Sequence, residues 1–274
     1  MSMLLRRRTW KGALAILCGL CVTAGVTAAA TSRARTQFKV DHQLCYTAAG
    51  KFKPPTAVTV RLINQFSPNG FVPKINPGLV VHCNPVIKTV VTPAGPKTYS
   101  VTNPHAHLGC FPITESQQKT WKVMVTNQFG QAVLTTGQPN LLCLPTWKSL
   151  TGPPRQKPTT PPGLNHFTCY PVTLVPGSGA YKAPAVILRD EFGKAQSQVS
   201  SVPKELCLPT TKIVGKREFP IIDAKTHLLC FPGVKHPFRP AVYDENQFGT
   251  SKVAIRIATW LCLPSTKQVI GPAG

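Results

Sequence analysis

The clearest pattern in the chain is an alternation of apolar and polar residues that leads into short polar turns. Two such segments are V-T-V-R-L at 58–62 and W-K-V-M-V at 121–125. Successive side chains of a strand point to opposite faces, so alternation with β-branched residues predicts half-buried β-strands. Helical apolar periodicity is absent after Ala30, and 28 prolines oppose long helices. The pattern predicts an all-β protein.

Each alternating segment ends in a turn of the form Asn/Asp-Gln/Glu-Phe-Gly, with Ser67 in place of Gly in the first copy. Asn or Asp at the first position and Gly at the fourth are typical of a type I turn. We expect the phenylalanine at the third position to fold back onto the core as a buried anchor. These residues are Phe66, Phe129, Phe192 and Phe248.

The turn is the centre of a repeat that occurs four times. Each copy opens with H-x-x-C, at His42/Cys45, His107/Cys110, His166/Cys169 and His227/Cys230. Each copy closes with C-x-P-x-x-K, at Cys83/Pro85/Lys88, Cys143/Pro145/Lys148, Cys207/Pro209/Lys212 and Cys262/Pro264/Lys267. The separation of Cys45 from Cys169 nearly equals that of Cys110 from Cys230, which indicates four repeats arranged as two pairs.

A proline-rich segment, residues 152–163, separates the two pairs. Because prolines favour an extended polyproline conformation, we expect a semi-rigid linker there. The predicted domains are residues 36–151, which hold repeats 1 and 2, and residues 164–272, which hold repeats 3 and 4. Short strands with Pro and Gly between them predict small disulfide-stapled sandwich or barrel modules, one for each pair.

Eight cysteines follow residue 40, two in each repeat. Only bridges within a repeat can recur identically four times, so the predicted disulfides are Cys45 with Cys83, Cys110 with Cys143, Cys169 with Cys207, and Cys230 with Cys262. Zinc is the alternative, because the His and two Cys of each copy are three soft ligands. A structural zinc site needs four, and no fourth ligand recurs. We expect no metal and no cofactor.

The N-terminus carries Arg6, Arg7, Arg8 and Lys11, followed by an uncharged stretch that ends in three alanines at 28–30. A basic head, an apolar middle and a small-residue exit predict a signal peptide over residues 1–30. The alternative is an uncleaved membrane anchor, although the stretch is rich in Gly, Ala and Thr. The export route stays open. We expect a secreted or cell-surface protein without membrane association after cleavage.

The chain is strongly basic, with 31 Lys and Arg against nine Asp and Glu and a net charge of +22. Removal of residues 1–30 takes four basic residues and no acidic one, which leaves a net charge of +18. Such a surplus favours polyanions through salt-sensitive attraction. The recurring candidates for polyanion binding are the closing lysines Lys88, Lys148, Lys212 and Lys267. Export and few exposed-looking aromatics argue against specific nucleic-acid binding.

Catalytic motifs are absent. No G-x-S-x-G occurs, and paired acidic residues recur only at Asp190/Glu191 and Asp244/Glu245. The histidines that precede the cysteines lack a recurring acidic partner and are predicted to be structural. We therefore expect a protein that is not an enzyme.

The repeat resembles a family of exported bacterial proteins known only as a domain of unknown function, whose copies carry H-x-x-C-Y, D-Q-F-G and L-C-x-P-x-x-K. The resemblance covers about residues 40–270 and is clearest at Cys45-Tyr46, Cys169-Tyr170, 127–130 and 206–212. Departures from the family pattern are Ser67, His82, Phe111 and Phe231. The resemblance implies an exported repeat module and brings no catalytic residues.

The sequence thus predicts an exported, non-enzymatic structural or adhesive protein at the cell surface, with anionic wall polymer or polysaccharide as the candidate partner. The alternative is a secreted enzyme or inhibitor whose site lies in the variable loops. The residues determine neither the ligand nor the oligomeric state.

Overall fold

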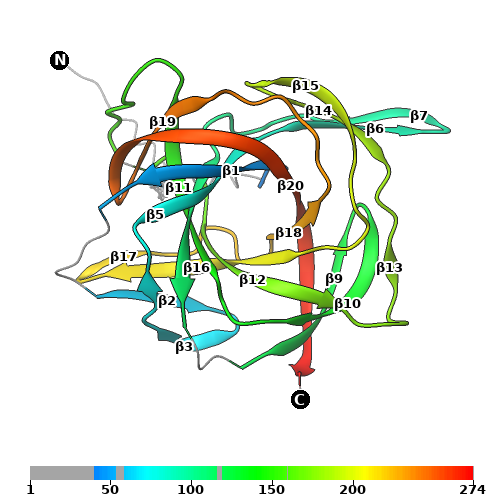
Figure 1. Ribbon diagram of the computed structural model, residues 1–274. Helices are drawn as coiled ribbons and strands as arrows, with labels where there is room; N and C mark the ends of the chain where they lie inside the picture. The colour runs from blue at the N-terminus through cyan, green and yellow to red at the C-terminus, as the bar shows by residue number, and fades with distance from the viewer. Residues whose placement is uncertain (1–39, 54–58, 116–118, 159, 274) are drawn as a thin grey trace, which may run out of the picture. The chain divides into compact units, whose positions relative to one another are not determined.

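All regular structure in the described part of the chain is β-strand. The computed structural model describes residues 40–53, 59–115, 119–158 and 160–273 (Figure 1). The all-β prediction is confirmed. Within these ranges no helix has the length and hydrophobicity that a membrane crossing needs. The predicted signal peptide, residues 1–30, lies outside the described residues.

Eight strands, two from each repeat, pair antiparallel in a closed ring. The ladder runs from β1 through its neighbours in chain order, and β20 pairs again with β1. The ring strands are β1 (Gln43–Lys51), β5 (Gly78–Pro85), β8 (His107–Thr114), β11 (Leu141–Ser149), β12 (His166–Leu174), β16 (Glu205–Val214), β18 (His227–Pro232) and β20 (Gly249–Pro272). All four repeats therefore share one ring.

The cysteines lie directly opposite one another on paired ring strands, as Cys45 and Cys83 do on β1 and β5. The four predicted disulfides are confirmed: Cys45–Cys83, Cys110–Cys143, Cys169–Cys207 and Cys230–Cys262. All eight cysteines line one small apolar cavity together with Leu108 and Phe167. The bridges also contact each other, since Sγ of Cys45 lies 3.7 Å from Sγ of Cys262.

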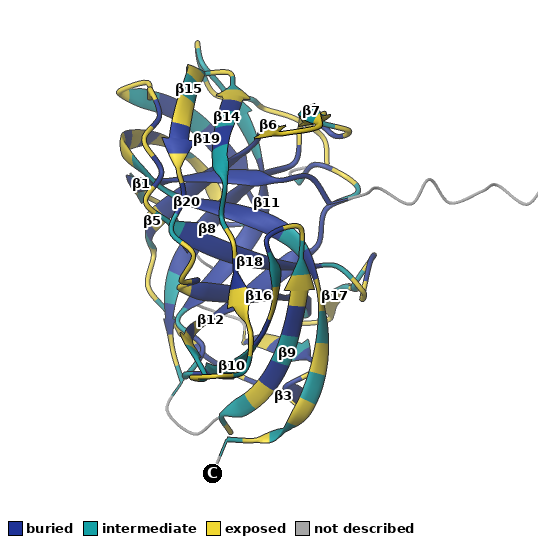
Figure 2. Ribbon diagram, turned by 90° about the vertical axis from the view of Figure 1, so that its right-hand side faces the viewer, coloured by how far each residue is buried: buried dark blue, intermediate teal, exposed yellow. Residues whose placement is uncertain are grey.

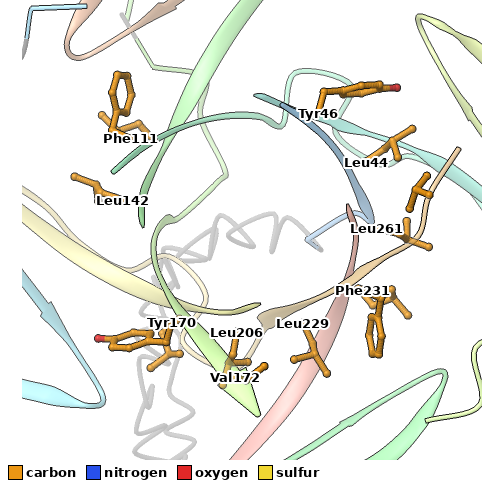
Figure 3. Close-up of a cluster of buried hydrophobic side chains, with 14 of the residues drawn as sticks. Leu44, Tyr46, Phe111, Leu142, Tyr170, Val172, Leu206, Leu229, Phe231 and Leu261 are labelled. Atoms are coloured by element: carbon orange, nitrogen blue, oxygen red, sulfur yellow. The ribbon is translucent and has the colours of Figure 1, made fainter. Parts of the chain in front are cut away.

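A larger apolar core covers the outer face of the ring. Side chains that alternate with the cysteines point away from the ring centre, as Figure 3 shows for Leu44, Tyr46, Phe111, Leu142 and Tyr170. Since side chains of a strand alternate between its faces, the cysteine face is the inner one. Figure 2 shows the ring strands mostly buried, whereas exposed and buried residues mix along outer strands such as β9. Each ring strand thus packs one face against the disulfides inside the ring and the other face against the apolar side chains outside it.

Each repeat adds an outer hairpin that closes with the Asn/Asp turn. The hairpins are β2 (Val60–Asn64) with β3 (Ser67–Phe71), β9 (Trp121–Asn127) with β10 (Gly130–Thr136), β14 (Ala185–Asp190) with β15 (Gly193–Gln198), and β19 (Ala241–Asn246) with the start of β20. In every turn the first residue's side-chain oxygen accepts a bond from the phenylalanine N–H, at 2.9 Å in the Asn64 turn. This is an Asx turn, which is why Asn or Asp recurs there.

The turn phenylalanines are the anchors that the sequence predicts, with one difference. Phe66, Phe129 and Phe248 are buried, whereas Phe192 is only partly buried. Gly130 follows its phenylalanine with a φ of 135°, a conformation that favours glycine. An added Cβ at Gly130 would also lie 2.6 Å from the Ala180 carbonyl oxygen. The anchor prediction is confirmed for three copies and holds in part for the fourth.

The hairpin of each repeat pairs with the closing strand of the repeat two places away. The pairs are β2 with β16, β9 with β20, β14 with β6 (Ile87–Thr92), and β19 with β11. Because each half of the chain holds hairpins of the other half, residues 37–274 form one compact unit. The predicted division into domains 36–151 and 164–272, with one module for each pair, is therefore wrong.

The proline-rich segment 152–163 is correspondingly not a free spacer. The N–H of Gln156 donates to Glu245 Oε2 at 2.8 Å, and Trp147 Nε1 donates to the Pro158 carbonyl at 2.8 Å. Short strands complete the fold: β4 (Lys74–Ile75), β7 (Gly95–Tyr99), β13 (Ala180–Tyr181) and β17 (Arg217–Phe219). Of these, β7 and β17 follow the closing lysines of repeats 1 and 3 and carry aromatic residues to them.

Candidate functional site

The four closing lysines, which the sequence offers as candidates for polyanion binding, are largely buried. Lys88 and Lys212 have no exposed surface, the side chain of Lys148 is 1% exposed, and Lys267 is half-buried. Each lysine lies on the strand segment that pairs with the hairpin of the repeat two places away. Burial keeps Lys88, Lys148 and Lys212 from contacting a polymer outside the protein, whereas Lys267 keeps part of its surface exposed.

Each lysine instead contacts the Gln/Glu-Phe turn of the next repeat. Nζ of Lys88 donates to Oε1 of Gln128 and lies 4.8 Å from the ring centre of Tyr99 and 5.0 Å from that of Phe129. The third repeat reproduces this arrangement with Lys212, Gln247, Phe219 and Phe248. The lysine head is thus enclosed by an amide and two aromatic faces.

The fourth lysine site joins the last repeat to the first. Nζ of Lys267 donates to Oε1 of Gln65 and lies 4.6 Å from the ring centre of Phe66. The contacts therefore run from repeat 1 to 2, 2 to 3, 3 to 4 and 4 to 1. This cyclic order explains why lysine, glutamine and phenylalanine recur together, since each copy supplies one half of two sites.

The opening histidines belong to the same sites. Nε2 of His42 lies 3.3 Å from Oε1 of Gln128, and Nε2 of His166 lies 3.2 Å from Oε1 of Gln247. Burial, followed by the nearby Lys212, lowers the pKa of His166 well below its ordinary value. The neutral imidazole then donates its Nε2 proton to the amide oxygen. The structural role that the sequence predicts for these histidines includes this contact.

Burial also lowers the pKa of the lysines that face glutamine. The pKa falls to about 7 for Lys88, to about 7 for Lys212, where Arg217 adds to the effect, and to about 8 for Lys267. Among the described residues, no ion pair joins these three lysines to a carboxylate. An appreciable fraction of each amine is therefore uncharged near neutral pH.

The Lys148 site is different, because Glu191 stands where the other copies have glutamine. Nζ of Lys148 lies 3.1 Å from Oε2 of Glu191 and donates to Oδ1 of Asn84 at 2.8 Å. Oδ1 of Asn84 also accepts from Nε2 of His82 at 2.9 Å, and Nδ1 of His82 lies 2.8 Å from Oδ2 of Asp244. Burial lowers the pKa of Lys148, while the charge of Glu191 opposes that shift.

The same network continues to a third carboxylate, that of Asp190. Asp190 accepts from the Tyr46 hydroxyl at 2.7 Å and from Nδ2 of Asn84 at 2.8 Å. Nδ1 of His236 lies 3.0 Å from the Tyr46 hydroxyl. Within the described ranges, no group of three His, Cys, Asp or Glu side chains is placed to hold a metal ion. The network therefore supplies hydrogen bonds and fixed charges rather than a set of metal ligands.

A groove of about 550 Å³ lies beside this network and is lined by His105, Trp147, Lys148, Ser149 and the 151–156 segment. The rings of His105 and Trp147 are 5.2 Å apart. The indole nitrogen is already bonded to Pro158, so the ring presents its apolar faces.

Sequence reasoning missed the network residues His82, Asn84 and Asp244. Their signal was a break in the repeat, since the residues on either side of the closing cysteine are leucines in the other three copies. Asp244 likewise stands two places before the turn, where the other copies have Leu or Val.

The model of a repeat of unknown function, DUF7450, matches residues 107–264. The chain belongs to the DUF7450 family. No curated protein and no solved structure matches it significantly. Family membership establishes a DUF7450 repeat and assigns it no activity.

Proposed function

We propose that this DUF7450 protein is an exported, non-enzymatic structural or adhesive protein whose basic exterior holds anionic wall polymer or polysaccharide. The observation that carries the proposal is the separation of charges between the surface and the interior. Every Lys and Arg of the described residues is exposed except the four closing lysines. Of the nine acidic residues, only Glu191 and Glu218 are exposed.

The acidic residues are used to build the fold. Asp41 is buried and accepts backbone N–H bonds from Thr102 and Asn103 at 2.9 and 2.8 Å. Asp244 pairs with His82, and Glu245 accepts from Gln156. Since these carboxylates face inward, almost nothing offsets the positive field that solvent and polymers meet. Four disulfides are compatible with an oxidising, extracytoplasmic location.

The proposal is tested with the purified protein on three immobilised polymers: a sulfated polysaccharide, a poly(glycerol phosphate) and a neutral dextran. We expect retention on both polyanions, release by moderate salt, and no retention on dextran, because the attraction is screened within a Debye length of about 10 Å at 0.1 M salt. Equal retention on dextran, or passage through all three columns, would contradict the proposal.

A charge variant locates the interaction. Lys51 and Lys252 are exposed and line one groove beside β1 and β20. We expect Lys51→Glu/Lys252→Glu to be released from both polyanions at lower salt than the native chain. The control is Glu218→Gln, which adds one net positive charge at an exposed site and should be released at equal or higher salt.

A further inference from the structure

Two of the lysine sites, those of Lys88 and Lys212, hold a fully buried amine in surroundings that suit an uncharged group, and the third, that of Lys267, is half-buried. Lys88 and Lys212 are fully buried, and neither has a carboxylate partner among the described residues. An unpaired ammonium in such a place is costly, whereas a neutral nitrogen is not. The amine therefore has its lone pair available, and the group that it contacts is the side-chain amide of a glutamine.

The glutamine amide is placed as an acceptor for attack. Its carbonyl oxygen contacts Nζ of the lysine in all three sites. In the Lys88 and Lys212 sites an opening histidine also donates to this oxygen, at 3.3 and 3.2 Å. Charge that develops on the oxygen during attack at the carbon would be stabilised by that donor, as in an oxyanion hole.

The amide nitrogen of the glutamine is the atom that would leave in such an attack. Nε2 of Gln247 is buried and has no hydrogen-bond partner among the described residues. A buried NH₂ group without a partner destabilises the fold. Its departure removes this penalty together with the penalty of the buried amine.

We propose that the closing lysines that face a turn glutamine are joined to it by isopeptide bonds that the folded chain forms itself. The pairs are Lys88 with Gln128, Lys212 with Gln247, and Lys267 with Gln65. This inference concerns covalent self-modification and does not depend on the proposed polyanion binding.

The reaction balances without a co-reactant. The lone pair of Nζ forms a bond to the glutamine Cδ, and the carbonyl electron pair moves to Oε1, where in the Lys88 and Lys212 sites the histidine Nε2–H stabilises the charge by a hydrogen bond. One proton passes from Nζ to the glutamine nitrogen, the C–N bond to that nitrogen breaks, and ammonia leaves. A primary amine and a primary amide become a secondary amide and ammonia, with no oxidation or reduction.

The bonds would link neighbouring repeats of the ring covalently. Two of them join repeat 1 to 2 and repeat 3 to 4, and the third joins the last repeat to the first. The link between Lys267 and Gln65 would hold the last repeat to the first covalently, in addition to the hydrogen bonds that join β1 and β20. Such a link suits a structural protein outside the cell.

The second repeat provides an internal control. Lys148 faces the carboxylate of Glu191 and is held in the charged network with Asn84. A carboxylate has no ammonia to release, and an ion-paired ammonium has no lone pair to attack with. Lys148 therefore stays a free lysine.

The test is mass spectrometry of the full-length gene product, isolated after export, reduced and denatured. We expect the intact mass to fall below that of the sequence, counted from its mapped N-terminus, by the mass of three ammonia molecules. A tryptic digest should contain three branched peptides that join the named pairs. Trypsin should cleave after Lys148 and not after the three cross-linked lysines. A folded protein with the full sequence mass, cleaved after all four lysines, would overturn the proposal.

Variants assign the bonds to their residues. Lys212→Met and Gln247→Met each remove one end of the same bond, so each should reduce the deficit to two ammonia molecules. Lys148→Met should leave it at three. A deficit of three in Lys212→Met or Gln247→Met would overturn the assignment. If either variant fails to fold, the peptide map of the native chain still decides.

Discussion

Lys88 and Lys148 occupy the same position of two successive repeats, yet their surroundings differ in chemistry. Lys88 is enclosed by Gln128 and two aromatic rings, without a charged partner in the described residues. Lys148 keeps one aromatic ring, Phe192 at 4.8 Å, and gains the carboxylate of Glu191. The comparison shows that the same contact between successive repeats can be built in two ways. At a neutral site the lysine faces a glutamine, as Lys88 does, and at the charged site Lys148 faces a carboxylate.

The charged site is possible because several repeats change together. Repeat 1 supplies His82 and Asn84, repeat 3 supplies Asp190 and Glu191, and repeat 4 supplies Asp244. In the other three copies of the repeat, the residues that correspond to His82 and Asn84 are leucines, and those that correspond to Asp244 are Leu or Val. A buried charge is tolerated only when partners satisfy it, so these exchanges form one unit.

The largest effect is expected from breaking the charged site. Both ring nitrogens of His82 face acceptor oxygens, Nδ1 at Asp244 and Nε2 at Asn84. Asp244→Leu should lower the free energy of unfolding by about 3–5 kcal/mol, because it removes one partner of a fully buried pair. The measurement is denaturant unfolding of the disulfide-intact protein.

The repeat itself supplies the control for that variant. His82→Leu/Asp244→Leu copies the apolar residues of the neutral sites and should recover most of the lost stability, because a buried ion pair replaced by packed apolar groups is often neutral. Two variants of equal stability would show that the pairing of His82 with Asp244 contributes nothing.

A pH dependence of intermediate size is expected at the neutral sites. Burial, with Lys267 as the next cause, lowers the pKa of His227 from 6.5 to about 4. Below pH 6.5 the unfolded chain binds a proton that the folded chain does not, so the free energy of unfolding falls as the pH falls towards 4, by about 3 kcal/mol in all.

His227→Gln checks this sign. The variant should be less stable than the native chain at pH 7, and the difference should shrink by about 3 kcal/mol at pH 4. His105→Gln, at an exposed histidine, is the control for loss of an imidazole at the surface. A His227→Gln difference that is constant with pH would rule out a titration of this residue on unfolding.

The smallest expected effect separates the two turn phenylalanines. Phe129 is 4% exposed at the Lys88 site, whereas Phe192 is only partly buried at the Lys148 site. Phe129→Ala should cost about 3–5 kcal/mol through lost burial and the cavity left behind. Phe192→Ala should cost about 1–2 kcal/mol less, because its ring leaves less apolar surface to expose. Equal denaturation midpoints would contradict the difference in burial.

The strands, turns and disulfides were predictable because they depend on residues close in sequence or on identity among copies. Asn64 and Phe66 form their turn through a bond two residues long. Cys45 and Cys83 lie in one repeat, and recurrence alone selects their pairing. The candidate site was less predictable: lysine, glutamine and histidine each recur visibly, but no local pattern shows that Lys88 meets Gln128 of the next repeat.

The sequence by itself determined an all-β repeat protein with four bridges, because alternation, turn chemistry and cysteine register are local properties that each copy carries complete. Only the tertiary structure decided that the four copies close one ring, that β2 pairs with β16 and β9 with β20, and that the closing lysines are buried. Those outcomes depend on which hairpin covers which strand across more than a hundred residues. Each repeat has an apolar outer face that it cannot bury alone, and burying it under the hairpin of a distant copy removes the lysines from solvent.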